Sequence, residues 1–534
     1  GNLTTGTVTT TGGTKGHGGN VSLSALGALS TGAAGNINTA GGTSITGNAG
    51  RNAGTVTLSG GSVSTGTITA TGSAGVGTNQ AGGGAGAVSI TATGAVTAGA
   101  ITSSSGNATG TGAGGTAGAI TLSGGDLSVG NLVTTGGTRG NGGHVSVTVT
   151  GNLTLPAVTT SAGAGGSSAG DVTLNSTSAV TQSGAIVAAG LALKGTGGSY
   201  VLRHAGNAVT TLAADTASID YAQSGALTVG TVGIAGVSVT GTASIETTGA
   251  ASNLTLSGAV AAAGTGDALI LKAGSSNAAG VATGGQIINS VGAGGISTPN
   301  GRYLAYSGDP STTTEGVTGY SKRYNTASAY IPSGTASHFL YRVAPTLTVV
   351  ANNKSRVYGD ANPVLDGSTS GLIDGDSAAG VGVSFATTAV ANTAVAAGPV
   401  AITPTVTNTQ NYTLALTNGA LTITARPLTV TATGQNKVYD GTTNATVTLG
   451  DNRVAGDNLS LAGTASFLNK NVGTAKTVNV TGINVTGTDA GNYTFNTSAT
   501  TTADITARAL TVSATGQNKV YDGTTNATVT LGDN

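Results

Sequence analysis

The stretch TVTLSGGSVSTGTITATG, residues 55–72, contains the pattern that decides the fold of the first half of the chain. Apolar Val, Leu and Ile alternate with Thr and Ser over short runs, and Gly separates the runs. Alternation with a period of two is typical of strands with one buried face, and Gly clusters are typical of turns. The stretch therefore predicts short strands joined by turns, and no helix of useful length.

This pattern recurs as a Gly-rich loop followed by V-x-L or a close variant. The units begin at Val21, Val56, Val88, Ile120, Val145 and Val172, so their spacing is unequal. Repeats of roughly 20–50 residues built from short strands are typical of a solenoid, whose coils bury their apolar faces against one another. We therefore predict an all-β fold in which residues 1–300 form a Gly/Thr-rich, right-handed parallel β-helix. Roughly ten coils at about 4.8 Å each would make a rod on the order of 50 Å long.

Side-chain size agrees with this prediction. The first aromatic residue is Tyr200, so the interior must be filled by Val, Ile, Leu, Ala and Thr methyl groups, which suits a thin core better than a thick one. The alternative is disorder, because Gly, Ser, Thr and Asn dominate the composition. The repeated alternation of β-branched residues favours the solenoid.

Composition excludes several function classes. Glycine supplies 93 of 534 residues and charged residues only 7%, against about 7% and about 25% in ordinary domains. The 19 basic and 19 acidic residues cancel, so the electrostatic signature of a nucleic-acid or anionic-membrane binder is missing. Cysteine is absent, which excludes disulfides, thiol catalysis and thiolate metal sites.

The sequence is uninformative about targeting, because a signal peptide or membrane anchor can lie outside these residues. No apolar run approaches the roughly 18 residues of a membrane-spanning helix. The chain lacks Met and stops inside a repeat, so we expect it to be part of a longer protein.

Residues 301–344 are rich in aromatic side chains. They are Tyr303, Tyr306, Tyr320, Tyr324, Tyr330, Phe339 and Tyr341. We predict a cap and linker, because a solenoid must cover its last coil. The alternative is a carbohydrate-stacking surface, for which Tyr303, Tyr306, Tyr320 and Tyr324 are the candidates.

A second, longer period follows Pro345. Tyr358, Tyr439 and Tyr521 recur at nearly equal intervals, and GQNKVYDGTTNATVTLGDN occurs at both 434–452 and 516–534. Alternating strands and Gly, Asn and Asp turns predict small all-β modules. Their predicted bounds are 345–426, 427–508 and a truncated start of a further module at 509–534.

The repeated Tyr-Asp-Gly string is a candidate site, and the first module carries Tyr-Gly-Asp at the equivalent place. The positions are Tyr358, Gly359, Asp360, Tyr439, Asp440, Gly441, Tyr521, Asp522 and Gly523. Catalysis would not tolerate a carboxylate that moves by one residue, whereas a tight turn would. We therefore predict a structural motif in which the tyrosines anchor the core and the aspartates form turns.

Acidic residues are too sparse on the solenoid to predict an enzyme. General acid-base cleavage of a glycosidic bond requires two carboxyl groups within roughly 5–10 Å. Residues 1–199 contain only Asp126 and Asp171, and further along only Asp215 and Asp220 lie close in sequence. We predict no catalytic residues.

Cofactor and metal motifs are also missing. His17 and His144 occupy related loops at different positions, so we interpret them as polar residues on exposed turns. The G-x-G-x-x-G string at 110 lacks the following helix of a dinucleotide site. Threonine alternation could form an ice-binding face, but the unequal coil spacings predict that the coils are out of register.

Residues 345–534 resemble the repeat modules of very large bacterial surface proteins. PTLTVVANNKSRVYGDANPVL at 345 is similar to the MBG type, and PLTVTATGQNKVYDGTT at 427 and ALTVSATGQNKVYDGTT at 509 are similar to the YDG type. The segment GRYLAYSGDP to FLYRVAP, residues 301–345, is similar to what joins such modules to a filamentous haemagglutinin-like β-helix.

The resemblance implies an adhesin-like exoprotein at the surface of a Gram-negative bacterium, exported by two-partner secretion through an outer-membrane pore. We expect a non-catalytic rod or spacer for cell adhesion or biofilm attachment, whose partners are host cells, matrix or abiotic surfaces, with glycans among the candidate ligands. The alternatives are a carbohydrate-active β-helix, with Asp215 or Asp220 in its chemistry, and a purely structural matrix protein.

Overall fold

The computed structural model describes residues 1–32 and 35–534, and its regular elements in this part are β-strands and two short 3-10 segments. The described chain forms two compact units. The first is Gly1–Thr346 with the short segments Ile373–Gly375 and Gln410–Thr413, and the second is the remainder from Leu347.

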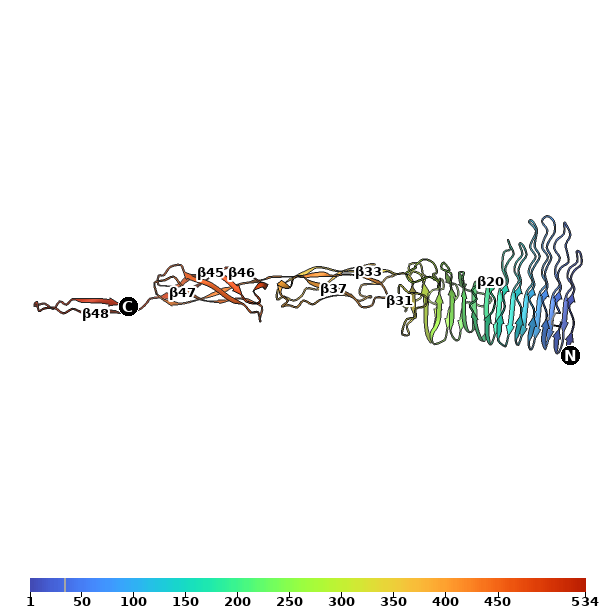
Figure 1. The fold of residues 1–534 in the computed structure, drawn as a ribbon, viewed down its shortest axis with the longest axis horizontal. Helices are drawn as coiled ribbons and strands as arrows, with labels where there is room; N and C mark the ends of the chain where they lie inside the picture. Colours follow the sequence, from blue (N-terminus) through green and yellow to red (C-terminus); the bar gives the residue numbers. More distant parts are fainter. Residues whose placement is uncertain (33–34) are drawn as a thin grey trace. The chain divides into compact units, whose positions relative to one another are not determined.

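The first unit is built on one parallel sheet of 32 strands, which winds as a solenoid (Figure 1). Each early coil contributes one strand to each of three ladders. The first ladder contains β3 (Val21–Ser24), β6 (Val56–Gly60), β9 (Val88–Ala92), β12 (Ile120–Gly124), β15 (Val145–Val149) and β18 (Val172–Ser176). The second contains β1 (Leu3–Thr4), β4 (Ala28–Ser30), β7 (Ser62–Thr65), β10 (Val96–Ala98), β13 (Leu127–Val129), β16 (Leu153–Leu155) and β19 (Ala179–Gln182). The third contains β2 (Val8–Thr9), β5 (Ile37–Asn38), β8 (Ile68–Thr69), β11 (Ile101–Thr102), β14 (Leu132–Val133) and β17 (Val158–Thr159).

The register of the first ladder confirms the predicted repeat. Val56 pairs with Val21 on one side and with Val88 on the other, and the ladder continues through the other V-x-L starts. These side chains point inward and fill the thin core, while the residues between them face outward. The all-β class and the parallel β-helix are therefore confirmed. The prediction that unequal spacings break the register is wrong, since outward Thr57, Ser89 and Thr121 are also aligned.

Longer strands continue the solenoid towards its C-terminal coils. The strand β20 (Ile186–Leu202) pairs with β17, β18 and β19, so it turns through all three ladders. The remaining strands are β21 (Ala208–Gln223), β22 (Leu227–Val229), β23 (Val237–Val239), β24 (Ala243–Thr247), β25 (Leu254–Leu256), β26 (Val260–Ala262), β27 (Gly266–Lys272), β28 (Ile287–Asn289), β29 (Ile296–Ser297), β30 (Gly301–Ser307), β31 (Ser321–Arg323) and β32 (His338–Tyr341). Because β30 pairs with β27 and β32 with β30, the ladder continues through the aromatic segment.

Differences in coil length are taken up by Gly-rich loops, residues 39–55, 70–87, 103–119, 134–144 and 160–171, which we call the glycine flange. Figure 1 shows the loops of these early coils, blue to cyan, standing out from the strands. The two arms of a loop bond to each other, as from Gly54 N to Thr39 O at 2.8 Å and from Gly86 N to Ala70 O at 3.1 Å. Neighbouring loops also bond, as from Gly72 N to Ser104 O at 3.0 Å. The sequence predicted simple turns here. Instead, each loop has two arms, and backbone hydrogen bonds link the arms to each other and to neighbouring loops.

Glycine is required in the flange because backbones approach too closely for side chains. A Cβ atom at Gly86 would overlap the carbonyl oxygen of Gly54 in the preceding coil, and one at Gly54 would overlap that of Gly19. Buried hydroxyl groups add further hydrogen bonds within the flange. For example, Thr39 Oγ1 donates to Gly54 O over 2.7 Å.

The second unit contains two modules with corresponding four-stranded sheets, in the orders β34-β39-β37-β36 and β42-β47-β45-β44. In each sheet the first pair is parallel and the others antiparallel. The elements of the first module are β33 (Thr346–Ala351), β34 (Lys354–Val357), β35 (Gly367–Ser370), β36 (Val383–Thr387), η1 (Val395–Ala397), β37 (Val400–Val406), β38 (Thr413–Thr417) and β39 (Gly419–Thr424). Those of the second are β40 (Arg426–Leu428), β41 (Thr431–Gln435), β42 (Lys437–Val438), β43 (Thr446–Gly450), β44 (Ser460–Phe467), β45 (Gly473–Thr486), η2 (Ala490–Asn492), β46 (Tyr493–Phe495) and β47 (Ser498–Thr506).

The last segment is a single antiparallel hairpin of β48 (Val512–Gly516) and β49 (Val529–Asp533). Every residue from Thr506 to Asn534 is exposed. The hairpin repeats the pairing of β41 with β43 at the start of the second module.

Candidate functional site

The carboxylates that a polysaccharide-cleaving solenoid would need lie on different faces. Asp215 is exposed on β21 beside Ser238, whereas Asp220 lies further along β21 beside Ser244, after the strand has turned. Asp220 Oδ1 accepts a hydrogen bond from the Arg203 guanidinium at 2.6 Å. The structure therefore uses Asp220 in an ion pair.

That ion pair is part of a charged row across neighbouring coils. Arg203 also pairs with Glu246, and Ser275 Oγ donates to the other oxygen of Glu246 over 2.5 Å. Burial by itself would raise the pKa of Glu246, but the hydrogen bonds from Ser275 and Arg203 outweigh it and hold the pKa below its usual value. The row links coils together and favours the ionised form of Glu246.

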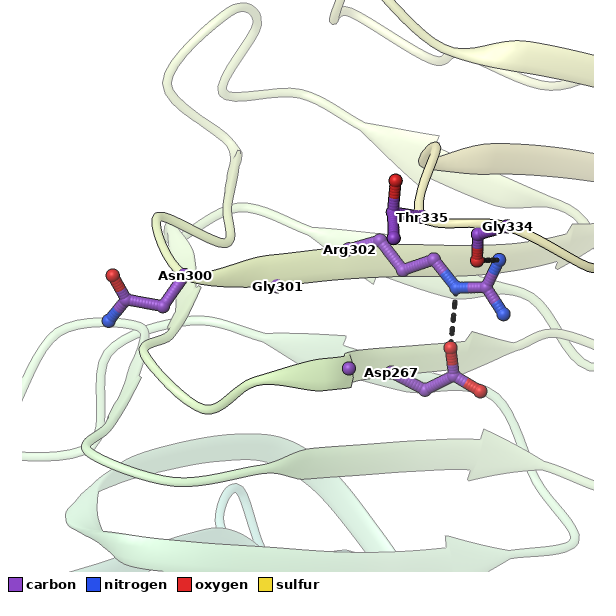
Figure 2. Close-up of a pocket in the computed structure, with 7 residues that line it drawn as sticks. Asp267, Asn300, Gly301, Arg302, Gly334 and Thr335 are labelled. Carbon is purple, nitrogen blue, oxygen red and sulfur yellow. Dashed lines mark hydrogen bonds and ion pairs between the residues drawn. The ribbon is translucent and has the colours of Figure 1, made fainter.

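A hollow of about 430 Å³ lies where β27 and β30 meet the chain at 334–335. Figure 2 shows the Arg302 side chain reaching towards Asp267 and Gly334. Arg302 donates to Asp267 Oδ1 at 2.5 Å, to Gly334 O at 2.7 Å and to Pro332 O at 2.8 Å. The guanidinium thus holds the loop before β32 onto the coil. Among the described residues that line the hollow, Asp267 is the one carboxylate, so the lining lacks the pair that glycosidic cleavage requires.

The aromatic residues of 301–344 pack into the end of the solenoid. Tyr303, Tyr306 and Tyr324 are buried and Tyr320 is half-buried. Phe339 lies at the centre of the cluster, with its ring centroid 6.0 Å from that of Tyr303 and 4.7 Å from that of Tyr320. Burial raises the pKa of both Tyr306 and Tyr320 to about 12. Because Tyr303, Tyr306 and Tyr324 are buried, a sugar would have to displace the groups that cover them in order to stack on their rings.

The two loop histidines bond to the next coil. His17 Nδ1 accepts from Asn52 N at 2.9 Å, and His144 Nδ1 accepts from Asp171 N at 3.0 Å. Several loop asparagines also accept with their side-chain oxygens: Asn20 Oδ1 accepts from Thr55 N, Asn52 Oδ1 from Gly84 N and Asn107 Oδ1 from Thr138 N, each at 2.8 Å. The signal that sequence reasoning missed is this recurring Asn or His in the flange, which links coils.

In the part of the chain that the structure describes, His, Asp and Glu form no group of three or more suited to a metal ion. The same residues include no helix long and apolar enough to cross a membrane.

The Tyr-Gly-Asp string forms a turn at the end of β34. Tyr358 N donates to Thr424 O at 2.9 Å, and Asp360 N closes the turn onto Val357 O at 3.2 Å. Gly359 has φ +83°, a conformation that favours glycine. The Tyr358 side chain is buried, and Asp360 Oδ1 accepts from Arg426 at 2.9 Å.

The Tyr-Asp-Gly string forms a related turn at the end of β42. Tyr439 N donates to Thr506 O at 2.9 Å, and Gly441 has φ +79°. Asp440 Oδ1 accepts from Lys437 Nζ and from Thr442 N, both at 2.9 Å. The Lys437 ammonium, with the Thr442 amide, lowers the pKa of Asp440 to about 2.

The third copy repeats this turn but not the expected core contact. Asp522 Oδ1 accepts from Lys519 Nζ at 2.9 Å and from Thr524 N at 3.0 Å, and Gly523 has φ +73°. Tyr521 is 93% exposed, so it is not a core anchor, because the β48–β49 hairpin packs against no further sheet of the described chain.

Tyr358 is buried because the second module covers it. Its hydroxyl donates to Asp457 Oδ1 at 3.2 Å, and Tyr493 donates to Asp457 Oδ2 at 2.5 Å. The two tyrosine rings meet edge to face, 5.6 Å apart at 75°. Val454 N donates to Tyr493 Oη at 2.8 Å, and Val395 N of η1 donates to Asn492 Oδ1 at 2.8 Å. We call Val454, Asp457, Asn492 and Tyr493 the entry end of the second module.

A similar contact occurs within the first unit. The rings of Tyr324 and Tyr412 lie 4.9 Å apart, edge to face. Asn411 Nδ2 donates to Tyr324 O at 2.8 Å, and Ile373 N donates to Tyr412 Oη at 3.0 Å. Ile373, Asn411 and Tyr412 occupy the places in the first module that Val454, Asn492 and Tyr493 occupy in the second. The same positions of the repeat therefore make the same kind of contact twice.

Comparison with known families identifies both modules. Residues 347–422 match the MBG domain of the YGX type, and residues 424–503 match the YDG domain. Both domains occur in bacterial adhesin-like proteins and are non-enzymatic modules. No curated protein and no solved structure matches the chain.

Proposed function

We propose that residues 1–534 are a non-catalytic segment of a large secreted or surface-attached bacterial adhesin, in which they act as a rod and spacer. The observation that carries the proposal is the succession of an MBG and a YDG domain after an in-register β-helix. Each added coil or module supplies length with contacts mainly to its neighbours. Attachment would come from many weak contacts acting together.

The proposed location is the outside of a Gram-negative cell, with export through an outer-membrane pore of the filamentous haemagglutinin type. The adhesin-type modules support a surface protein in general. The lack of Cys is compatible with this route, because no disulfide can lock the chain before export. The proposed partners are host cells, matrix or abiotic surfaces.

Two measurements test this proposal on the purified chain. We expect small-angle scattering to give an elongated particle, and coated beads to adhere to host cells, matrix or plastic more than beads coated with a protein of similar charge. A compact particle without adhesion would contradict the proposal. An elongated particle without adhesion would contradict the adhesive role and would support only the role as a spacer.

The hollow beside Arg302 supports one alternative, a polysaccharide-binding β-helix. Its lining combines Asp267 and Asn300 with Thr335, which are groups that could bond to sugar hydroxyls. A glycan array, compared between the native chain and Asp267→Asn, Asp215→Asn and Asp220→Asn, would separate the two functions. Binding that only Asp267→Asn abolishes would favour the alternative.

A further inference from the structure

The contact between the MBG and YDG domains places a receiving surface at the end of one module and an entry end on the next. The receiving surface consists of Tyr358, Gly359 and Val395, and it binds the entry end defined above. A Cβ atom at Gly359 would overlap Val454 Cγ2, so the turn glycine also lies directly against the entry end. An apolar cluster runs through the contact and includes Ile423 of the MBG domain.

The YDG domain has the equivalent surface, and it is uncovered. The turn glycine of this surface is Gly441, one position later in the string than Gly359, and it also has a positive φ, but a Cβ atom there would meet nothing within 4 Å. Tyr439 is half-buried, whereas Tyr358 is 2% exposed.

Exposed apolar side chains surround this surface. Val438, Leu468 and Val472 are 56%, 68% and 53% exposed. Strand pairing brings them to one end of the module, because Val438 pairs with Thr506 and Gly473, next to Val472, pairs with Ile505. We call Val438, Tyr439, Gly441, Leu468 and Val472 the exit patch.

Two of the lysines beside the exit patch are already paired. Lys437 Nζ bonds to Asp440 and to the carbonyl of Asn444, and Lys476 Nζ bonds to Asn469 and to the carbonyl of Asn471. The patch therefore presents apolar groups, a tyrosine and, between Leu468 and Val472, the exposed Lys470. This chemistry matches an entry end, which supplies Val454, Tyr493 and one carboxylate.

The chain after the exit patch indicates which module belongs there. Residues 516–534 are identical to residues 434–452, so another YDG-type sequence begins directly after the YDG domain. Leu428 and Val430 are 3% and 2% exposed in the cluster at the first contact, whereas the corresponding Leu510 and Val512 are 63% and 57% exposed. Leu428 and Val430 pack among residues of their own module, including Leu459, Val480 and Ile483, so Leu510 and Val512 need the corresponding residues of a further YDG-type module for burial.

We propose that the exit patch is the docking surface for the entry end of a further YDG-type module. In this contact, the counterparts of Val454, Asp457 and Tyr493 cover Gly441 and Tyr439, while Leu510 and Val512 are buried in the core of the further module. The tyrosine-aspartate-tyrosine contact then joins YDG domains to one another as it joins the MBG domain to the YDG domain.

The test inserts a second copy of residues 427–508 after Arg508 in the full chain. Tyr439→Trp in the first copy provides the probe, because the protein contains no native Trp. We expect the Trp emission to shift to shorter wavelength relative to Tyr439→Trp in the uninserted chain. Leu414→Trp, in the MBG domain, serves as the matched control and should emit identically with and without the insertion.

A second variant separates docking from mere folding of the inserted module. Asp457→Ala and Tyr493→Ala, made only in the inserted copy, should abolish the shift while hydrogen exchange still shows protected amides in that copy. If the Trp emission does not shift in the insertion variant without the Ala substitutions, the proposal is overturned, whether or not the amides of the inserted module are protected from exchange. A shift that persists in the Ala variants overturns it as well, because the entry end would not be its cause.

Discussion

At the residue scale, glycine in this chain has two separate roles, and the sequence shows only one of them. Gly359 and Gly441 adopt positive φ in turns, which the Tyr-Gly-Asp and Tyr-Asp-Gly strings predict. Gly54 and Gly86 do not have positive φ; they are required because the backbone of the preceding coil lies against them. The latter role depends on residues one whole coil away, so local pattern cannot reveal it.

Replacement of a flange glycine should therefore be costly. In Gly86→Ala the new methyl group meets the Gly54 carbonyl, and backbone must move to admit it. Overpacking of this kind costs about 1–3 kcal/mol. We expect hydrogen exchange of peptides covering residues 70–87 to accelerate by roughly tenfold or more. Gly13→Ala, where a Cβ atom meets nothing within 4 Å, is the control, and equal acceleration in both variants would contradict the close-packing argument.

The hydroxyl of Tyr358 should matter more than that of Tyr439, although the two occupy equivalent turns. Tyr358→Phe removes the hydrogen bond to Asp457, and burial already raises the pKa of this tyrosine by disfavouring its charged form. We expect a loss of about 1 kcal/mol, measured as faster exchange in peptides covering residues 426–430 and 490–496. Tyr439→Phe should leave the same peptides unchanged. A larger effect in Tyr439→Phe would refute the assignment of the contact.

At the element scale, the sequence predicted the strands that repeat and missed those that do not. The V-x-L units gave the first ladder directly, because alternation and spacing are local signals. The strand β20 could not be anticipated, since its 17 residues turn through three ladders and its shape is imposed by three earlier strands. The charged row was missed for the same reason, because Arg203 and Glu246 come from different coils.

The charged row should make its coils sensitive to acid. The pKa of Glu246 lies below its ordinary value in the fold, so ionised Glu246 stabilises the folded state above that ordinary value, about 4.5, and the contribution is lost as pH falls through the lowered pKa. We expect hydrogen exchange of β21 and β24 to show less protection at pH 3 than at pH 6, after correction for the intrinsic rate. Glu246→Gln should reduce this difference.

Asp215→Asn provides the control for the acid experiment. Asp215 lies on the same strand as Asp220 but is exposed, so its replacement should leave the pH dependence of β21 and β24 as in the native chain. If Asp215→Asn and Glu246→Gln behave alike, the pH dependence does not come from the row.

At the scale of the whole molecule, the predictable part is the succession of repeats and the unpredictable part is how each repeat ends. Both periods, the short one of the solenoid and the longer one of the modules, were visible in the sequence. The sequence did not predict the Tyr358–Asp457–Tyr493 contact. Its residues come from two modules, and Asp457 and Tyr493 have no distinctive local pattern.

Removal of one coil tests the repeat organisation of the first unit. Deletion of residues 88–119 joins Ala87 to Ile120, and Ile120 then takes the place of Val88 against Val56, because Val88 pairs with both. The other two ladders close in the same way, since Leu127 replaces Val96 against Val63 and Leu132 replaces Ile101 against Ile68. In a solenoid, stability is a sum over coils and their neighbours, so we expect a folded chain with native β-sheet circular dichroism and protected β6 and β12. Deletion of residues 93–102 removes β10 and β11 but keeps β9, so the second and third ladders each lose a strand while the first does not, and β7 and β13 should lose protection. If the two deletions lose protection equally, the coils are not the independent stacking units that their register indicates.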